Sequence, residues 1–194
     1  MALLEMIEQQ LDANTVRQMG ERVGVDPDKT GQAINAALPM LLAAMARNTS
    51  DPNGAAGLAE AIDQDHDGSL LDNVPGYLNA PSGRAADGDG ILRHVLGGRR
   101  SQVEEGLGNA TGLNASQIAR LLPLLAPVVM AALGRLKKKQ NLDAGGLAGV
   151  LGGEQREMQQ RTPGILDALE GLLDRNRDGS MMDDVLGGVF GSRR

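Results

Sequence analysis

The apolar residues of the chain fall into stretches that polar turns and glycines separate. The most apolar stretch runs from Leu121 to Gly134, between Arg120 and Arg135. Two prolines interrupt it and it is too short to span a bilayer, so we expect buried core and no transmembrane segment. Runs of β-branched and aromatic residues, which strands favour, are absent. The pattern therefore predicts an all-α fold.

The hydrophobic pattern repeats along the chain. At an offset of 88 residues, Val25-Asp-Pro-Asp-Lys29 falls on Leu113-Asn-Ala-Ser-Gln117, and Arg47 falls on Arg135. Two acidic decapeptides correspond at an offset of 111, because the second copy holds an insertion of roughly twenty residues. Self-similarity at a fixed offset is typical of a duplicated structural unit. The chain is therefore expected to contain two repeated helical units.

Each unit is expected to contain a helix-turn-helix-like hairpin, a shorter helix, an EF-hand-like acidic loop and an exit helix. Asp26 and Asn114 are predicted helix N-caps, and Pro27 suits the first helical position. Pro39 and Pro127 are expected to kink or restart the second helix of each unit, because an interior proline removes a backbone hydrogen bond and clashes with the preceding turn.

The boundaries of the units follow from composition. The first unit covers residues 1–78, with its acidic loop at 63–73, and the second covers 90–194, with its loop at 174–184. Residues 79–89 have the glycine, proline and aspartate content of a linker. We expect two halves that pack intimately, with separate domains as the alternative.

The two acidic loops carry the candidate chemistry, since both have the form Asp-x-[Asp/Asn]-x-Asp-Gly-Ser-x-x-Asp. Calcium prefers oxygen ligands, and an EF-hand supplies them from loop positions one, three and five, with glycine at position six. Both loops satisfy these positions, so we predict two calcium sites. The predicted ligands are Asp63, Asp65, Asp67, Ser69, Asp72, Asp174, Asn176, Asp178, Ser180 and Asp183.

The loops depart from a standard EF-hand at position twelve, where Val74 and Val185 stand in place of a bidentate glutamate. Ser-x-x-Asp has the spacing of a helix N-cap and its third-residue acid, so Asp72 and Asp183 are expected to close a contracted loop of modest affinity. The alternative is a pair of solvated turns in which aspartates cap helices. A third cluster, Asp87-Gly-Asp-Gly90, lacks a full ligand set and is expected to be a turn.

Composition narrows the function. The chain has one Phe, one Tyr, no Trp and no Cys, so leucine, alanine, valine, isoleucine and nine methionines must build the core. No catalytic triad order, zinc spacing or phosphate loop is present, and we expect no enzymatic activity. His66 is expected to point to solvent, and His94 to be packed or half-exposed. The acidic N-terminus lacks a secretory signal, which favours a cytoplasmic location.

The acidic loops, the run Gly90-Ile-Leu-Arg-His-Val-Leu-Gly-Gly98 and the stretch from Leu121 to Met130 together resemble one bacterial family. It is the domain-of-unknown-function family 937, related to the YidB-like proteins. The resemblance implies a helical protein with calcium-loop motifs. It implies no established activity, so no catalytic residue is carried over.

DNA binding is the competing hypothesis. The segment Met19 to Ile34 resembles a helix-turn-helix, in which Lys29, Gln32 and Asn35 would face DNA. The pI of about 4.9 argues against it, because phosphate neutralisation needs a basic face. The basic residues from Arg135 to Lys139 lie at the end of an apolar helix, where positive charge interacts favourably with the helix dipole. We expect these residues to be solvated.

The sequence thus favours a calcium-binding helical protein with an interaction or scaffold role. Its calcium sites are expected to be structural. Leucine and methionine side chains that a small core leaves exposed would bind a protein partner or a second copy of the chain.

Overall fold

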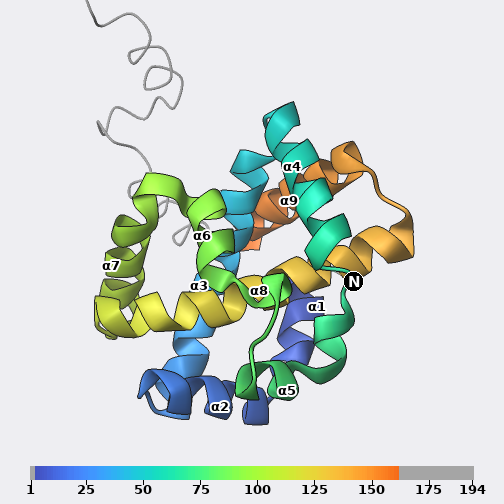
Figure 1. The fold of residues 1–194 in the computed structure, drawn as a ribbon. Coiled ribbons are helices and arrows are strands. Elements are labelled where there is room, and N and C mark those ends of the chain that lie inside the picture. The colour runs from blue at the N-terminus through green and yellow to red at the C-terminus, as the bar shows by residue number, and fades with distance from the viewer. Residues whose placement is uncertain (1–2, 162–194) are drawn as a thin grey trace, which may run out of the picture.

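Helices make up most of the chain that the computed structural model describes, residues 3–161, and this part contains no strand. The predicted all-α class is confirmed. The predicted ligands Asp174, Asn176, Asp178, Ser180 and Asp183 lie outside the described residues. In chain order the elements are α1 (Leu3–Gln10), α2 (Ala13–Val23), α3 (Pro27–Asn48), α4 (Pro52–Asp65), η1 (Ser69–Asn73), α5 (Val74–Asn79), η2 (Arg84–Ala86), α6 (Gly88–Leu96), η3 (Gly97–Arg99), α7 (Arg100–Thr111), α8 (Ala115–Gln140) and α9 (Ala144–Arg161) (Figure 1).

The two longest helices, α3 and α8, lie at the centre and the shorter helices surround them (Figure 1). Both are preceded by a helix that ends at a left-handed glycine, Gly24 with φ 72° and Gly112 with φ 71°. Glycine adopts this conformation without the steric cost that a Cβ brings. The same turn therefore leads into both central helices.

The predicted N-caps are confirmed. The carboxylate of Asp26 accepts a hydrogen bond from the backbone N–H of Lys29 at 3.0 Å, and Pro27 occupies the first turn of α3. The side chain of Asn114 accepts from the backbone N–H of Gln117 at 2.9 Å, and the Gln117 side chain accepts from the backbone N–H of Asn114 at 3.0 Å. These bonds satisfy backbone donors that have no partner within the helix.

Of the expected kink or restart at the interior prolines, the restart does not occur. Pro39 lies within α3, and Pro123 and Pro127 lie within α8, and both helices continue through them. Pro127 is itself buried. Tertiary packing along both helices compensates for the hydrogen bonds that the prolines remove, since packing supplies most of the stability of a protein helix.

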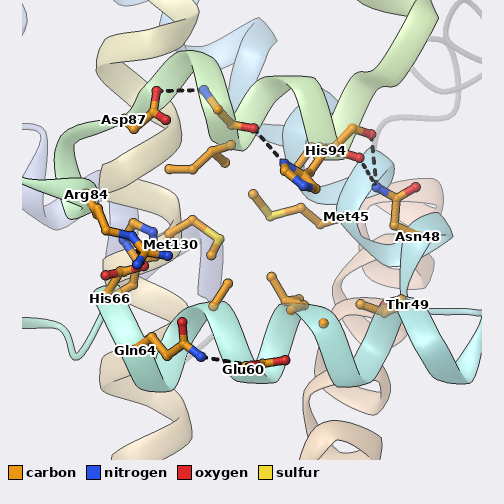
Figure 2. Close-up of a pocket in the computed structure, with 18 of the residues that line it drawn as sticks. Met45, Asn48, Thr49, Glu60, Gln64, His66, Arg84, Asp87, His94 and Met130 are labelled. Carbon is orange, nitrogen blue, oxygen red and sulfur yellow. Dashed lines mark hydrogen bonds and ion pairs between the residues drawn. The ribbon is translucent and has the colours of Figure 1, made fainter.

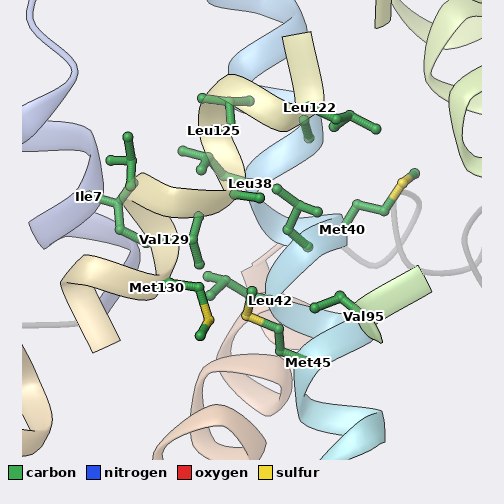
Figure 3. Close-up of a cluster of buried hydrophobic side chains, with 14 of the residues drawn as sticks. Ile7, Leu38, Met40, Leu42, Met45, Val95, Leu122, Leu125, Val129 and Met130 are labelled. Carbon is green, nitrogen blue, oxygen red and sulfur yellow. The ribbon is translucent and has the colours of Figure 1, made fainter. Parts of the chain in front are cut away.

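The core forms where α3 and α8 meet. Leu38, Leu42 and Met45 of α3 pack with Val129 and Met130 of α8, and side chains of α1 and α6 complete the cluster (Figure 3). The cluster draws on residues before and after the segment 79–89, which itself contains η2 and the start of α6.

The stretch from Leu121 to Gly134 is buried core, as predicted. Within the described residues, α8 is the one helix long and apolar enough to cross a membrane, but most of its apolar stretch is buried inside the protein. A helix whose apolar residues are mostly buried within the protein is typical of the centre of a globular core.

Candidate cation-binding loop

The first acidic loop follows α4 and turns sharply at Gly68, where φ is 93°. The carboxylate of Asp67 accepts a hydrogen bond from the backbone N–H of Ser69 at 3.0 Å. Hydrogen bonding to Ser69 favours the ionised carboxylate and lowers the pKa of Asp67. The loop therefore has the sharp glycine turn that its sequence predicts at position six.

The end of the loop differs from the contracted EF-hand that we predict from sequence. Ser69 begins the short 3₁₀-helix η1, whose N-cap residue is Gly68 and which has no side-chain cap, and the exit helix α5 begins only at Val74. Asn73 caps α5 by accepting from the backbone N–H of Gly76 at 2.9 Å. The Ser-x-x-Asp spacing therefore does not mark the start of the exit helix.

The loop lies directly against the C-terminal end of α8. A Cβ placed on Gly134 would stand 1.8 Å from the carbonyl oxygen of His66, so the two backbones touch at a position that only glycine permits. The Arg135 guanidinium donates to the carbonyl oxygen of Gly68 at 2.9 Å. A backbone contact and a side-chain hydrogen bond thus fix the loop on α8 from both sides of the turn.

Each predicted carboxylate ligand of this loop faces a cation. The N–O distances are 2.5 Å for Asp63 with Lys137, 3.3 Å for Asp65 with Arg84, 3.6 Å for Asp67 with Lys138 and 2.5 Å for Asp72 with Arg135. Of the residues Arg135 to Lys139, expected to be a solvated helix end, Lys138 and Lys139 are exposed, but three of the five residues pair with the loop. Arg135, Lys137 and Lys138 supply counter-charges to the loop.

These carboxylates suit calcium in chemistry but not in arrangement. Among residues 3–161, no three Asp, Glu or His side chains are placed to share one metal ion. The oxygens of Asp63, Asp65, Asp67 and Asp72 point to separate cations, and Ser69 is exposed. Calcium ligation by this loop would require carboxylates to leave their basic partners.

His66 is only 6% exposed, so the expectation that it points to solvent is wrong. The reason is that the loop folds back onto α8 and turns this even position inward. Its Nδ1 makes no hydrogen bond within the described residues, a situation that costs about 1–3 kcal/mol. Burial lowers the pKa of His66, although the Asp65 carboxylate opposes the shift. His94 is exposed, with Nδ1 2.9 Å from the carbonyl oxygen of Gly90.

A groove between α4 and α6 lies beside the loop and is a feature that the sequence analysis misses. It encloses a cavity of about 730 Å³. Met45 and Met130 lie between the two helices at its base, and His66 and Arg84 stand at one end (Figure 2). The sequence holds no compact motif for it, because its walls come from four separate helices.

The residues of the DNA-binding hypothesis lie on α3 beside acidic side chains. Lys29, Gln32 and Asn35 are all exposed. Lys29 directly follows Asp28 in the first turn of α3, which Asp26 caps. Accessibility alone does not test nucleic-acid binding, which stays a prediction.

The fold and loop define a helical protein in which an acidic segment is docked on a basic helix end. The family model described as "Bacterial protein of unknown function (DUF937)" matches residues 5–136, about two thirds of the chain. The chain belongs to this family, as its motifs predict. The match includes the first acidic loop and ends within α8, before the second. No curated protein and no solved structure matches the chain.

Proposed function

We propose that the chain is a non-enzymatic, calcium-binding helical protein whose acidic loops bind the ion in exchange for ion pairs with basic side chains. One observation carries the proposal. Asp63 and Asp67, at positions one and five of the first loop, line the same hollow of about 290 Å³, and Lys137 and Lys138 line it with them. The hollow therefore brings carboxylate oxygens and lysine ammonium groups together.

The charges of the loop support exchange with a cation. Asp63, Asp67 and Asp72 are more than half exposed, so their side chains can turn without unpacking the core. Exposed ion pairs contribute only about 0–1 kcal/mol each, which a divalent ion can offset. The repeated motif at 174–184 supports the same chemistry from sequence, and a duplicated unit would bring a second loop of this kind.

The same ion pairs predict a weak site. Calcium must displace at least the Lys137 ammonium from Asp63, and aspartate rather than glutamate stands at the end of the loop. We therefore place the affinity in the micromolar to millimolar range that weaker calcium loops cover. Such a site would stabilise the loop itself, which the backbone contact between Gly134 and His66 keeps on α8, and the ordered loop would serve an interaction or scaffold role.

Thermal unfolding of the full chain with calcium, with magnesium and with a chelator tests the proposal. Calcium should raise the melting temperature, because a ligand that binds only the native state stabilises it by about 2.7 kcal/mol at a hundredfold excess over Kd. Lys137→Gln should lower the calcium concentration needed for the same rise, because it removes the competing cation from Asp63. Asp63→Asn with Asp174→Asn should abolish the rise.

Lys29→Gln is the matched control, because Lys29 is an exposed lysine on α3 that is far in the chain from either loop. It should leave the calcium dependence unchanged. An unchanged melting temperature in millimolar calcium, for both the natural chain and Lys137→Gln, would show that the loops do not bind the ion.

A further inference from the structure

The groove between α4 and α6 has an apolar base and partly exposed apolar walls. Met45 and Met130 are buried at the base (Figure 2). Leu58 of α4 and Ile91 of α6 also line the groove and are half-buried. A cavity of about 730 Å³ falls within the range of sites that bury an apolar ligand or the side chains of a docked helix. Methionine at the base suits such contact, because its flexible thioether adapts to the shape it meets.

The rim of the groove is acidic. Asp51, Glu60, Asp65 and Asp87 line it, whereas Arg84 is the one Arg or Lys among the described lining residues and is paired with Asp65. Asp51, Glu60 and Asp87 are exposed. An occupant with apolar side chains and positive charge would therefore complement both the base and the rim.

His66 is a buried polar group at one end of the groove. Its side chain is more than nine-tenths buried, it lines the groove, and its Nδ1 has no hydrogen-bond partner among the described residues. Buried polar atoms are nearly always hydrogen-bonded in native proteins. This atom has no solvent contact in the open groove, so a bound segment would reach it only if the imidazole turned toward the groove.

The chain contains a segment of matching chemistry. Residues 185–194 read Val-Leu-Gly-Gly-Val-Phe-Gly-Ser-Arg-Arg, with the only Phe of the chain at 190 and two arginines near its end. Val185, Leu186, Val189 and Phe190 have the spacing of one helix face. Residues 162–184, a stretch of 23 residues, join this segment to α9, and α9 packs against both α3 and α4, which form part of the groove. A tether of this kind gives a high effective concentration.

We propose that residues 185–194 dock into the groove between α4 and α6 of the same chain, with Phe190 over the methionines and the arginines at the acidic rim. The proposal does not require calcium binding, although Asp65 belongs both to the rim of the groove and to the first acidic loop. It assigns the groove an intramolecular peptide ligand that an external apolar, basic peptide would have to displace.

Tryptophan fluorescence tests it in the full chain, with a chelator present. Phe190→Trp introduces the only indole, so emission reports this position alone. We expect blue-shifted emission and protection from acrylamide. In that background, Ile91→Glu should weaken docking about tenfold or more, because it places a carboxylate on the apolar wall. Glu60→Lys should weaken docking about two- to fivefold, because reversing one exposed charge on the rim has only a small effect on binding.

Glu105→Lys is the matched control, because Glu105 is an exposed glutamate on α7 outside the groove. It should leave the introduced indole protected. Changing Arg193 and Arg194 to Glu should expose the indole, and adding Glu60→Lys should restore part of the protection. Solvent-like emission in the starting variant would overturn the proposal, as would protection that both groove substitutions leave intact. Protection that is lost on dilution would overturn the intramolecular assignment and place the segment in a second copy.

Discussion

The two central helices begin alike and end differently. Both α3 and α8 follow a left-handed glycine and an Asx N-cap. At its C-terminal end, α3 uses the neutral side chain of Asn48, which donates to the carbonyl oxygens of His94 and Val95 at 3.0 and 3.1 Å. The end of α8 instead holds the acidic loop with Arg135, Lys137 and Lys138. Similar N-terminal signals therefore build two helices that hold different partners.

Two kinds of interaction hold the loop at the end of α8, ion pairs and a close backbone contact. The carboxylates of Asp63, Asp67 and Asp72 are largely exposed, although the Lys137 side chain is not, and solvent should keep the contribution of these pairs small. The backbone contact between Gly134 and His66 is buried and cannot accept a side chain. In the sequence comparison Gly134 falls on Ala46 of α3, which does carry a Cβ. Close approach, more than ionic attraction, is therefore expected to set the position of the loop.

The largest expected effect comes from Gly134→Val. The added side chain would enter the space of the His66 carbonyl, and either the loop or α8 must move. We expect the free energy of unfolding to fall by about 3 kcal/mol or more, the size of a severe packing defect. Urea denaturation followed by circular dichroism measures it.

Gly149→Ala in α9 is the control for helix propensity, because nothing lies within 4 Å of a Cβ at that position. It should stabilise the protein by roughly 0.5–1 kcal/mol. If Gly134→Val cost less than about 1 kcal/mol, the close backbone contact would contribute little, and the ion pairs rather than shape would hold the loop on α8.

An intermediate effect is expected at alkaline pH from Tyr77 on α5, the helix that follows the loop. Burial raises the pKa of Tyr77 from 10.0 to about 12, and the charge of Arg22 opposes the shift only in part. The folded protein keeps this proton while the unfolded chain loses it near pH 10. Stability is therefore intact below about pH 10 and falls between about pH 10 and 12, by roughly 2–3 kcal/mol.

Because Tyr77 is the only Tyr, tyrosinate absorbance follows its titration directly. The folded chain should titrate at about 12 and the chain in denaturant at about 10. Tyr77→Phe should remove this part of the alkaline loss of stability. Titration at about 10 in the folded chain would mean that α5 opens readily, and that the end of α8 does not hold the segment beyond the loop.

The same contrast explains what the sequence predicts well. Asp26 and Asn114 are recognisable because a cap bonds to a backbone group three residues away, and Leu121 to Gly134 is recognisable because its apolar content is continuous. Signals of this kind are local. The helical class, the N-caps and the main core segment follow from them.

The site is only half predictable. The sequence singles out Asp63 and its neighbours, but the partner Lys137 lies 74 positions away, and no local pattern joins them. The inward turn of His66 likewise depends on contact with Gly134, which is remote in sequence. Local motifs name the carboxylates, whereas tertiary contact decides whether lysine, arginine or a metal ion neutralises them.

The smallest expected effect compares the starts of the two helices directly. Asp26→Ala and Asn114→Ala should each lower the free energy of unfolding by about 1 kcal/mol, the usual contribution of an N-cap. Asn114→Ala should cost slightly more, because Asn114 and Gln117 bond to each other's backbone whereas Asp26 makes a single capping bond. Urea denaturation measures both, with Asp28→Ala as the control for loss of a first-turn carboxylate. Equal costs at Asp26 and Asn114 would mean that the reciprocal bond adds nothing. A cost at Asn114 alone would mean that α3 depends on its packed C-terminal half, and that the likeness of the two starts is one of geometry rather than of energy.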